Sequence, residues 1–512
     1  MMAGRTRRAN SMEIRHGRRR RRRDRAAVKD SERREGREAE AKTTVANHLC
    51  RYESAEQERS AREQAVVDKV AVLRAKLPVL LRRLSKIPDP RNPKKIKHML
   101  SSLMLYGILG FVLQVASRRE ANRELTRPVF RENLIALFPE LESIAHHDTL
   151  MRLLDRIDVE QIQEAHGELV RSLIRKRKFA HLLVEGCYPI AIDGTQKFAT
   201  YTLWDEQYLE RQVGDEKARR TQYYIYVVEA NFVFTGGITI PLMSEFLDYR
   251  EGDSGREKQD CELRGFYRMI NKLHRAFPRL PIMLLLDGLY PVGPAMEQCQ
   301  KYGWEFMIVL QNGCLPQIWE EYEGLKNLLE DEDRHRMNWG AREQRFHWVN
   351  GIEYSYGVRR GKRRMKVHMV VCHETWREPD PAGGRPLEKK VRHVWLSNRP
   401  LSKDNVHPRC NLAARHRWGI ELGILVEKHQ GYHYEHCFAY SGQAMKGYHY
   451  LMRIAHLMNV LAHHSTRLAG LVKELGTRGL IRFIRHTLSA PWIDRSAVQR
   501  RLSRPCQLRL VT

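Results

Sequence analysis

Two aspartates each stand at the end of a short apolar run and are followed by glycine. Asp193 ends the run 188–192, and Asp287 ends the run 280–286. Apolar runs of this length, bounded by Pro and Gly, predict strands that are buried on both faces. A carboxylate at the carboxyl end of such a strand lies where open α/β sheets bind ligands, and burying it requires a cation or hydrogen bonds. The pair therefore predicts a shared divalent-metal site, and the alternative is that each Asp only opens a turn.

A third carboxylate is predicted on a helix within residues 415–428. Arg417 and Lys428 stand four residues before and seven residues after Glu421, so all three side chains share one helical face. Cations on both sides of a metal-bound carboxylate could hold a phosphate backbone across the site. The alternative is a surface helix with ordinary ion pairs, and Glu427 is assigned to that alternative because it points away from this face.

The composition favours a polyanionic partner. The 512 residues include 89 Lys and Arg against 61 Asp and Glu, which gives a formal net charge of +28. Only 19 of these basic residues and 11 of the acidic ones fall within residues 1–64, so the excess extends over the whole chain. Nucleic acid is the favoured partner, and an anionic membrane surface is the alternative. The nine cysteines form no CxxC pair, as is typical of free thiols in a reducing cytosol.

No secretory signal is visible, because the arginine run 18–23 is followed by polar residues. The stretch 99–116 is uncharged and nominally long enough to span a membrane. It contains serines, glycines and a glutamine, and its neighbours are strongly charged. It is therefore predicted to be a buried core helix.

The periodicity divides the chain into segments. Residues 1–65 lack large apolar side chains and are predicted to be a basic, disordered tail or a solvated helix. Residues 66–180 have a helical period throughout and are predicted to form a DNA-binding domain, although a plain helical packing domain is equally permitted. Residues 181–310 hold strands at 223–228 and 232–240, with a turn at Ala230-Asn231, and then alternate strands with helices, which predicts a mixed α/β sheet.

The second half changes character twice. Residues 311–400 are predicted to be a β-rich insertion, with strands at 345–356, 366–372 and 391–396 and a hairpin at 379–386. Residues 401–490 are helical again, and residues 491–512 are predicted to be a tail.

The order strand-Asp, strand-Asp, helix-Glu in a basic protein resembles the DDE transposases of bacterial insertion sequences. Within them the chain is similar to the branch with the signature Tyr-x2-Arg-x3-Glu-x6-Lys. Arg417, Glu421 and Lys428 match that signature, whereas Ala414 stands at the Tyr position. The resemblance covers roughly residues 70–470. It continues through the segments 192–195, 258–262, 285–290, 396–398 and 428–432.

The resemblance implies an α/β fold: an RNase H-like mixed sheet with a β-rich insertion, preceded by an all-α N-terminal domain. The 134 residues between Asp287 and Glu421 exceed what one strand and one helix need. Related transposases of this branch carry a β insertion at that place, so the excess supports the resemblance.

The implied activity is cleavage at transposon ends followed by strand transfer into target DNA. Two Mg²⁺ ions, with Mn²⁺ as a substitute, would be held by Asp193, Asp287 and Glu421, with Asp193 bridging the ions. Arg417 and Lys428 would contact DNA. The implied partners are DNA and a second copy of the chain in a synaptic homodimer, with no membrane, in the bacterial cytoplasm at the nucleoid. An RNase H-like nuclease without strand transfer and a catalytically inactive DNA-binding relative are the alternatives.

Other candidate groups are assigned structural roles, each with a functional alternative. Four acids are expected to be surface charge, and of these Glu262 is the one that could lie near the metals. Three histidines have ligand spacing but no Cys or carboxylate partner for zinc. Four tryptophans are expected in the core, although an aromatic could stack on an extruded base. A basic cluster could touch phosphates or be a solvated turn. These groups are Glu245, Asp248, Asp260 and Glu262; His429, His433 and His436; Trp319, Trp339, Trp348 and Trp395; and Arg359, Arg360, Lys362, Arg363 and Arg364.

Overall fold

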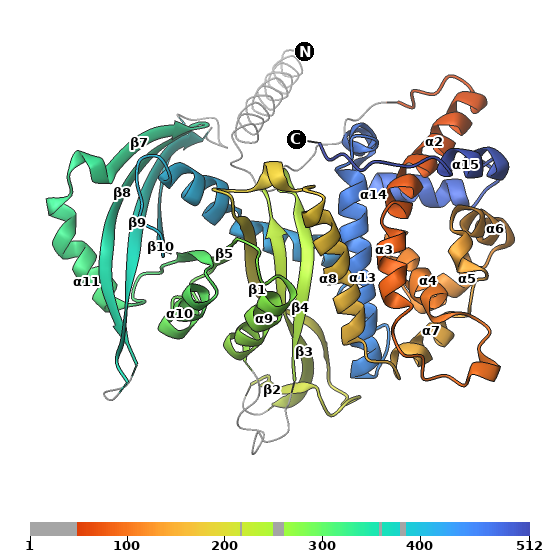
Figure 1. Cartoon of the computed structure of the whole chain (residues 1–512), viewed down its shortest axis with the longest axis horizontal. Helices are drawn as coiled ribbons and strands as arrows, with labels where there is room; N and C mark the ends of the chain where they lie inside the picture. Colours follow the sequence, from red (N-terminus) through yellow and green to blue (C-terminus); the bar gives the residue numbers. More distant parts are fainter. Residues whose placement is uncertain (1–48, 216–217, 249–260, 358–360, 379–385, 512) are drawn as a thin grey trace, which may run out of the picture.

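The computed structural model describes residues 49–511 except 216–217, 249–260, 358–360 and 379–385 (Figure 1). Most of the predicted tail and hairpin lie outside the described residues. Helix α2 begins at Ala55, inside the predicted tail, because Ser54 caps it and its later turns bury valines in the core. Among the described residues, the α-helices that precede the sheet are α2 (Ala55–Arg74), α3 (Leu77–Leu84), α4 (Leu100–Val112), α5 (Arg118–Glu124), α6 (Pro128–Leu137), α7 (His147–Leu154) and α8 (Glu160–Arg175).

The centre of the molecule is one large mixed sheet. Its order is β2-β3-β1-β5-β6-β10-β9-β8-β7, and β4 pairs with β3 off this path. The strands are β1 (Tyr188–Thr200), β2 (Leu209–Val213), β3 (Arg220–Val233), β4 (Thr239–Leu247), β5 (Ile282–Leu286), β6 (Glu305–Val309), β7 (Arg334–Trp339), β8 (Arg342–Tyr356), β9 (Arg363–Glu378) and β10 (Leu387–Ser397). The predicted mixed α/β fold is confirmed.

Five of these strands form the part of the sheet that positions the site. β1 pairs antiparallel with β3 and β3 antiparallel with β4, whereas β1, β5 and β6 are parallel to one another. The parallel connections pass through helices α9 (Glu262–Ala276) and α10 (Gly293–Lys301). Every residue of β5 is buried, as its uninterrupted apolar run predicts.

The predicted turn at Ala230-Asn231 is wrong. β3 runs through both residues with only an irregularity in its pairing to β4, and the chain reverses at residues 234–238 instead. Gly236 and Gly237 have φ of 75° and 78° and supply the left-handed backbone that this reversal needs. Asn231 is fully buried, which explains why it does not lie in a turn.

The segment after β6 extends the sheet. β7 to β10 form an antiparallel meander that joins β6 through β10, and helix α11 (Pro316–Leu325) contacts β8. Figure 1 shows this meander curving away from the centre. The predicted strands at 345–356, 366–372 and 391–396 fall within β8, β9 and β10. β7 was not predicted.

Helices from both ends of the chain lie together beside the sheet (Figure 1). α13 (Gly442–His463) contacts α4, α7 and α8, and α14 (Ala469–Leu488) contacts α2 and α6. α15 (Arg495–Leu502), within the predicted tail 491–512, also packs on α2 and α6 and buries Val498. α4 is almost entirely buried, in agreement with the predicted core helix. Among the described helices, none combines the length and the apolar character needed to cross a bilayer.

Lys69 is a buried cation among these helices. It lines a small apolar cavity between α2, α4, α6 and α14, and within the described residues its Nζ has no hydrogen-bond partner. Burial lowers the pKa of Lys69 to about 7, whereas the unfolded chain keeps its proton up to about pH 10.5.

A pH-dependent stability follows from Lys69. Between about pH 7 and 10.5 the unfolded state binds a proton that the folded state lacks, so the free energy of unfolding should rise by up to about 1.4 kcal/mol per pH unit. Lys69→Met should remove this slope, as measured by urea unfolding at several pH values. Parallel curves for the wild type and the variant would contradict the prediction.

Candidate active site

Asp193 and Asp287 lie at the same level of two adjacent parallel strands. The β1–β5 ladder ends at Ala191 and Leu285, two residues before each Asp. Residues paired in this ladder are 94 positions apart in the sequence (285 − 191), and so are the two aspartates (287 − 193). Adjacent strands are about 4.8 Å apart, so the two carboxylates leave the sheet side by side.

Asp193 does not end its strand, contrary to the sequence prediction. β1 continues to Thr200 because β3 still pairs with it on the other side, with Asp193 opposite Glu229. Gly194 therefore opens no turn. Its role is steric, because a Cβ at this position would overlap the Glu262 carboxylate and the Tyr226 ring.

Asp287 follows β5 directly and does open a turn. Its Oδ1 accepts a hydrogen bond from the backbone N–H of Leu289 at 2.9 Å, an arrangement that Asp side chains commonly make after a strand. The same side chain is only partly buried. Asp287 could open this turn and also bind a metal ion, because only one of its two carboxylate oxygens accepts the hydrogen bond from Leu289.

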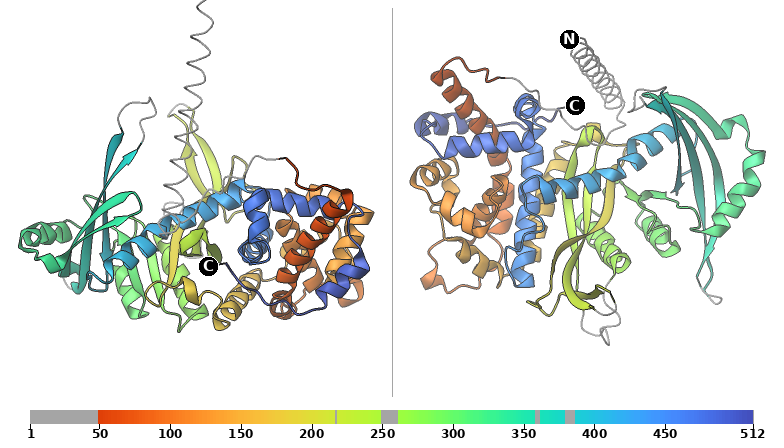
Figure 2. Two further views of the ribbon diagram at one scale, coloured as in Figure 1. Left: turned by 90° about the horizontal axis from the view of Figure 1, so that it is seen from above. Right: turned by 180° about the vertical axis from the view of Figure 1, so that it is seen from behind.

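Helix α12 (Trp418–His429) carries Glu421 across the sheet. It contacts β1, β3 and β4, and Figure 2 (right) shows it in light blue running over the strands. Ile420 and Ile424 share a buried cluster with Ala191 and Leu285. These contacts place Glu421, which lies between the two isoleucines in sequence, near the end of the parallel ladder.

Arg417 and Lys428, which were predicted to share one helix face with Glu421, have different partners in the structure. Arg417 is buried, and its Nη2 donates to Glu421 Oε1 at 2.8 Å, as the i, i+4 spacing predicts. Lys428 pairs with Glu435 instead, at 2.9 Å. The structure thus joins Arg417 to the carboxylates and leaves Lys428 at the other end of α12.

The charges of the neighbouring acids act on Asp193. Burial first, then the negative charge of Glu262, and to a smaller extent the charges of Asp287 and Glu421 together raise the pKa of Asp193 to about 7, against the opposing charge of Arg417. Asp287 and Glu421, the other two predicted ligands, therefore both raise the pKa of Asp193. Mutually repelling carboxylates in a partly buried place are typical of functional sites.

Glu262, at the first turn of α9, is the strongest charged neighbour of Asp193. Its two oxygens accept hydrogen bonds from Tyr226 at 2.7 Å and from Tyr290 at 2.8 Å. Tyr290 is fully buried. The two hydroxyls fix the carboxylate against Gly194, the residue after Asp193 in β1, so the one acid that was expected to come near the predicted ligands lies close enough to raise the Asp193 pKa.

The donor set fits a divalent cation in its chemistry. Among the described residues, no group of three His, Cys, Asp or Glu side chains is arranged to hold a metal ion. The charged groups that shift the Asp193 pKa are nevertheless three carboxylates and Arg417, and carboxylate oxygens are ligands that Mg²⁺ prefers. A divalent cation would relieve the repulsion that raises the Asp193 pKa.

A buried ion network lies behind the cluster, and sequence reasoning missed it. Glu427, expected on a surface helix, is fully buried and accepts from Arg453 at 3.0 Å and lies 2.6 Å from His456. Arg453 also lies 3.2 Å from Glu229, the residue opposite Asp193. Tyr434 donates to Glu229 at 2.8 Å. The network ties α12 to β3 and α13.

Charge pairing keeps this network ionised. Burial alone would raise the pKa of Glu229 and of Glu427, but Arg453 holds both pKa values below their usual range. Burial lowers the pKa of Lys197, a further cation near both acids, to about 8. Two carboxylates and two cations balance each other, so α12 is held in one orientation.

The remaining candidate groups are structural where they can be described. Glu245 is buried against Arg268 and Lys272, and Asp248 pairs with Lys446 at 3.3 Å. The three histidines belong to no metal-binding group among the described residues. Trp339, Trp348 and Trp395 are buried, Trp319 is partly buried, and Arg363 of the basic cluster pairs with Glu297. Asp260, Arg359 and Arg360 lie outside the described residues.

Comparison with known proteins relates part of the chain to transposases. Residues 81–170, which span the end of α3 through most of α8, match the family described as DDE_Tnp_1-associated. This match indicates a relation to DDE-type transposases for the helical region. No curated protein matches the chain.

Solved structures also match the chain, and one of them is similar at a low level. It is the cryo-EM structure of the piggyBac transposase synaptic complex with hairpin DNA, with a TM-score of 0.34, 13% identity and 85% of each chain covered. A TM-score this low does not establish a common fold.

Proposed function

We propose that the chain is a DDE-type DNA transposase that cuts DNA with divalent metal ions. The observation that carries the proposal is the placement of Asp193 and Asp287 at one level of adjacent parallel strands, with Glu421 close enough to raise the Asp193 pKa. The family match over residues 81–170 supports the class. A bacterial insertion-sequence origin and a nucleoid location are parts of the same proposal.

The proposed core is RNase H-like. The supporting observation is the strand order β4-β3-β1-β5-β6, with three antiparallel strands followed by two that run parallel to β1. β7 to β10 then form the insertion between the second Asp and the Glu helix. The helices before β1 would be the all-α, DNA-binding domain.

Asp193, Asp287 and Glu421 would hold two Mg²⁺ ions, for which Mn²⁺ could substitute. Ions in such a site stabilise the attacking and leaving oxygens of an in-line phosphodiester displacement. Arg417 keeps Glu421 oriented through its 2.8 Å hydrogen bond. Glu262, fixed by two tyrosines, adds a negative charge that would attract a divalent cation to this place. A homodimer would bring two DNA ends together.

The test is Mg²⁺-dependent nicking of a duplex that carries the DNA flanking this gene. Strand cleavage that stops on chelation and returns with Mg²⁺ or Mn²⁺ is expected. Joining of the freed 3′ end to a second duplex would show transfer, whereas cutting without joining would favour the nuclease alternative. No cleavage with either ion would contradict the proposed enzyme.

A further inference from the structure

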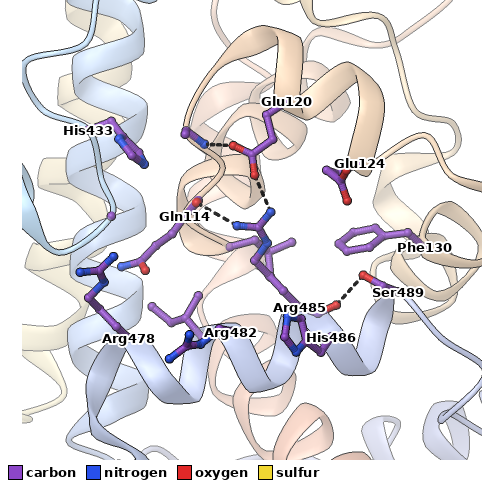
Figure 3. Close-up of a pocket in the computed structure, with 14 residues that line it drawn as sticks. Gln114, Glu120, Glu124, Phe130, His433, Arg478, Arg482, Arg485, His486 and Ser489 are labelled. Carbon is purple, nitrogen blue, oxygen red and sulfur yellow. Dashed lines mark hydrogen bonds and ion pairs between the residues drawn. The ribbon is translucent and has the colours of Figure 1, made fainter.

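A cavity of about 640 Å³ lies between the helical region and the end of α12. Figure 3 shows its lining side chains: Glu120 and Glu124 from α5, Phe130 from α6, His433 from the loop after α12, and a row from α14. None of these residues belongs to the carboxylate cluster around Asp193.

The row on α14 is cationic. Arg478, Arg482 and Arg485 follow one another at spacings of four and three residues, and His486 stands four residues after Arg482, so all four line one side of the helix. Arg485 is neutralised, because its Nη2 donates to Glu120 at 2.6 Å and its Nη1 to the Gln114 carbonyl at 3.2 Å.

Arg478 and Arg482 have no such compensation. Both are exposed, and within the described part of the chain neither makes a hydrogen bond or an ion pair. Like charges one helical turn apart repel each other. The second acid of the lining, Glu124, already pairs with Arg127 at 2.9 Å. The uncompensated charge of the cavity is therefore positive.

The ligand class that fits two free guanidinium groups is a phosphate. Guanidinium groups bind phosphate oxygens through paired, charge-assisted hydrogen bonds. A cavity of this size accepts single phosphate groups along its rim, not a whole duplex. A nucleic-acid backbone supplies neighbouring phosphates that both arginines could use at once.

Helix α12 sets the distance between the cavity and the proposed cleavage site, because it runs from Glu421 to the cavity wall. Gly431 ends α12 with φ of 97°, and a Cβ there would meet the Gln114 side chain, so the end of α12 is held against the cavity wall. Gly431 stands ten residues after Glu421, eight of them within α12, which corresponds to roughly 15 Å. That distance corresponds to about four to five base pairs at 3.4 Å each.

We propose that Arg478 and Arg482 bind phosphates of the DNA strand that passes from the scissile bond at Glu421 along α12. This inference rests on the proposed function, since it takes the strand at Glu421 to be DNA. It adds a contact site on the C-terminal helix α14, outside the predicted DNA-binding region.

The experiment measures binding of the full chain to an end-containing duplex as a function of salt. Each lost phosphate contact should reduce the slope of log affinity against log salt by about 0.9, so Arg478→Gln with Arg482→Gln should reduce it by about 1.8. The double Lys variant should keep most of the slope because it keeps both charges. Arg275→Gln with Arg279→Gln, two exposed arginines four residues apart at the end of α9 and beyond it, is the matched control.

The outcomes separate this inference from the proposed function. A slope loss confined to the α14 Gln pair supports the phosphate site. An unchanged slope for that pair, or an equal loss for the α9 pair, would overturn it even if the wild type binds and nicks DNA. A wild type that neither binds nor nicks DNA would overturn the proposed function and this inference together.

Discussion

Asp193→Asn is expected to reduce Mg²⁺-dependent nicking by at least about 1,000-fold, which corresponds to about 4 kcal/mol of transition-state stabilisation. The amide keeps the shape of the carboxylate but removes the charge that would hold both ions. DNA binding should remain, because the variant leaves Arg478 and Arg482, the proposed phosphate-binding residues, unchanged. Nicking under single-turnover conditions and binding by fluorescence anisotropy measure the two properties separately.

The same variant has a second expected effect, on stability. With a pKa of about 7 in the folded state against 3.8 in the unfolded chain, Asp193 destabilises the fold progressively as pH rises from about 4 to 7. Without metal, Asp193→Asn should therefore raise the free energy of unfolding at pH 7.5, by about 1–2 kcal/mol after allowance for solvent screening. Asp155→Asn, at an exposed position, is the control. A variant that still nicks, or is less stable than the wild type, would contradict the assignment.

Arg453→Met is expected to lower the free energy of unfolding by about 3–5 kcal/mol, because it leaves two buried carboxylates without their shared cation. Glu229 and Glu427 are both fully buried and both contact Arg453. Nicking should fall as well, since Glu427 fixes the helix that carries Glu421. Urea unfolding measures the loss.

Two comparisons sharpen this prediction. Adding Glu229→Gln and Glu427→Gln to Arg453→Met should restore part of the lost stability, because the buried charges disappear. Arg336→Met removes a surface ion pair with Glu343, in which the arginine side chain is 68% exposed. This change should lower the free energy of unfolding by less than about 1 kcal/mol. If Arg453→Met cost no more than Arg336→Met, the network would not hold α12.

The sequence predicted the positions that depend on local pattern. The apolar runs before Asp193 and Asp287 do pair as parallel strands, and the i, i+4 spacing of Arg417 and Glu421 does produce a contact. The end of β1 could not be predicted from its own residues, since β3 extends it. The turn after β3 was misplaced although Gly236-Gly237 carried the stronger turn signal.

The parts of the site that tertiary contacts create were mostly missed. Glu262 reaches Asp193 through the path of α9, which no local pattern reveals. The ion network joins residues 229, 427 and 453, which are distant in sequence. Its signal was a single Glu within the apolar strand 223–234 and a single Arg within an apolar helix, since each charge needs a buried partner there.

Binding of Mn²⁺ to the full chain, followed by electron paramagnetic resonance in the presence of end-containing DNA, tests the central claim most directly. We expect up to two bound Mn²⁺ ions per chain, and we expect this binding to be lost when Asp193, Asp287 and Glu421 are replaced by Asn, Asn and Gln. Binding of the same strength and stoichiometry in the triple variant would contradict the claim that these three acids form the metal site.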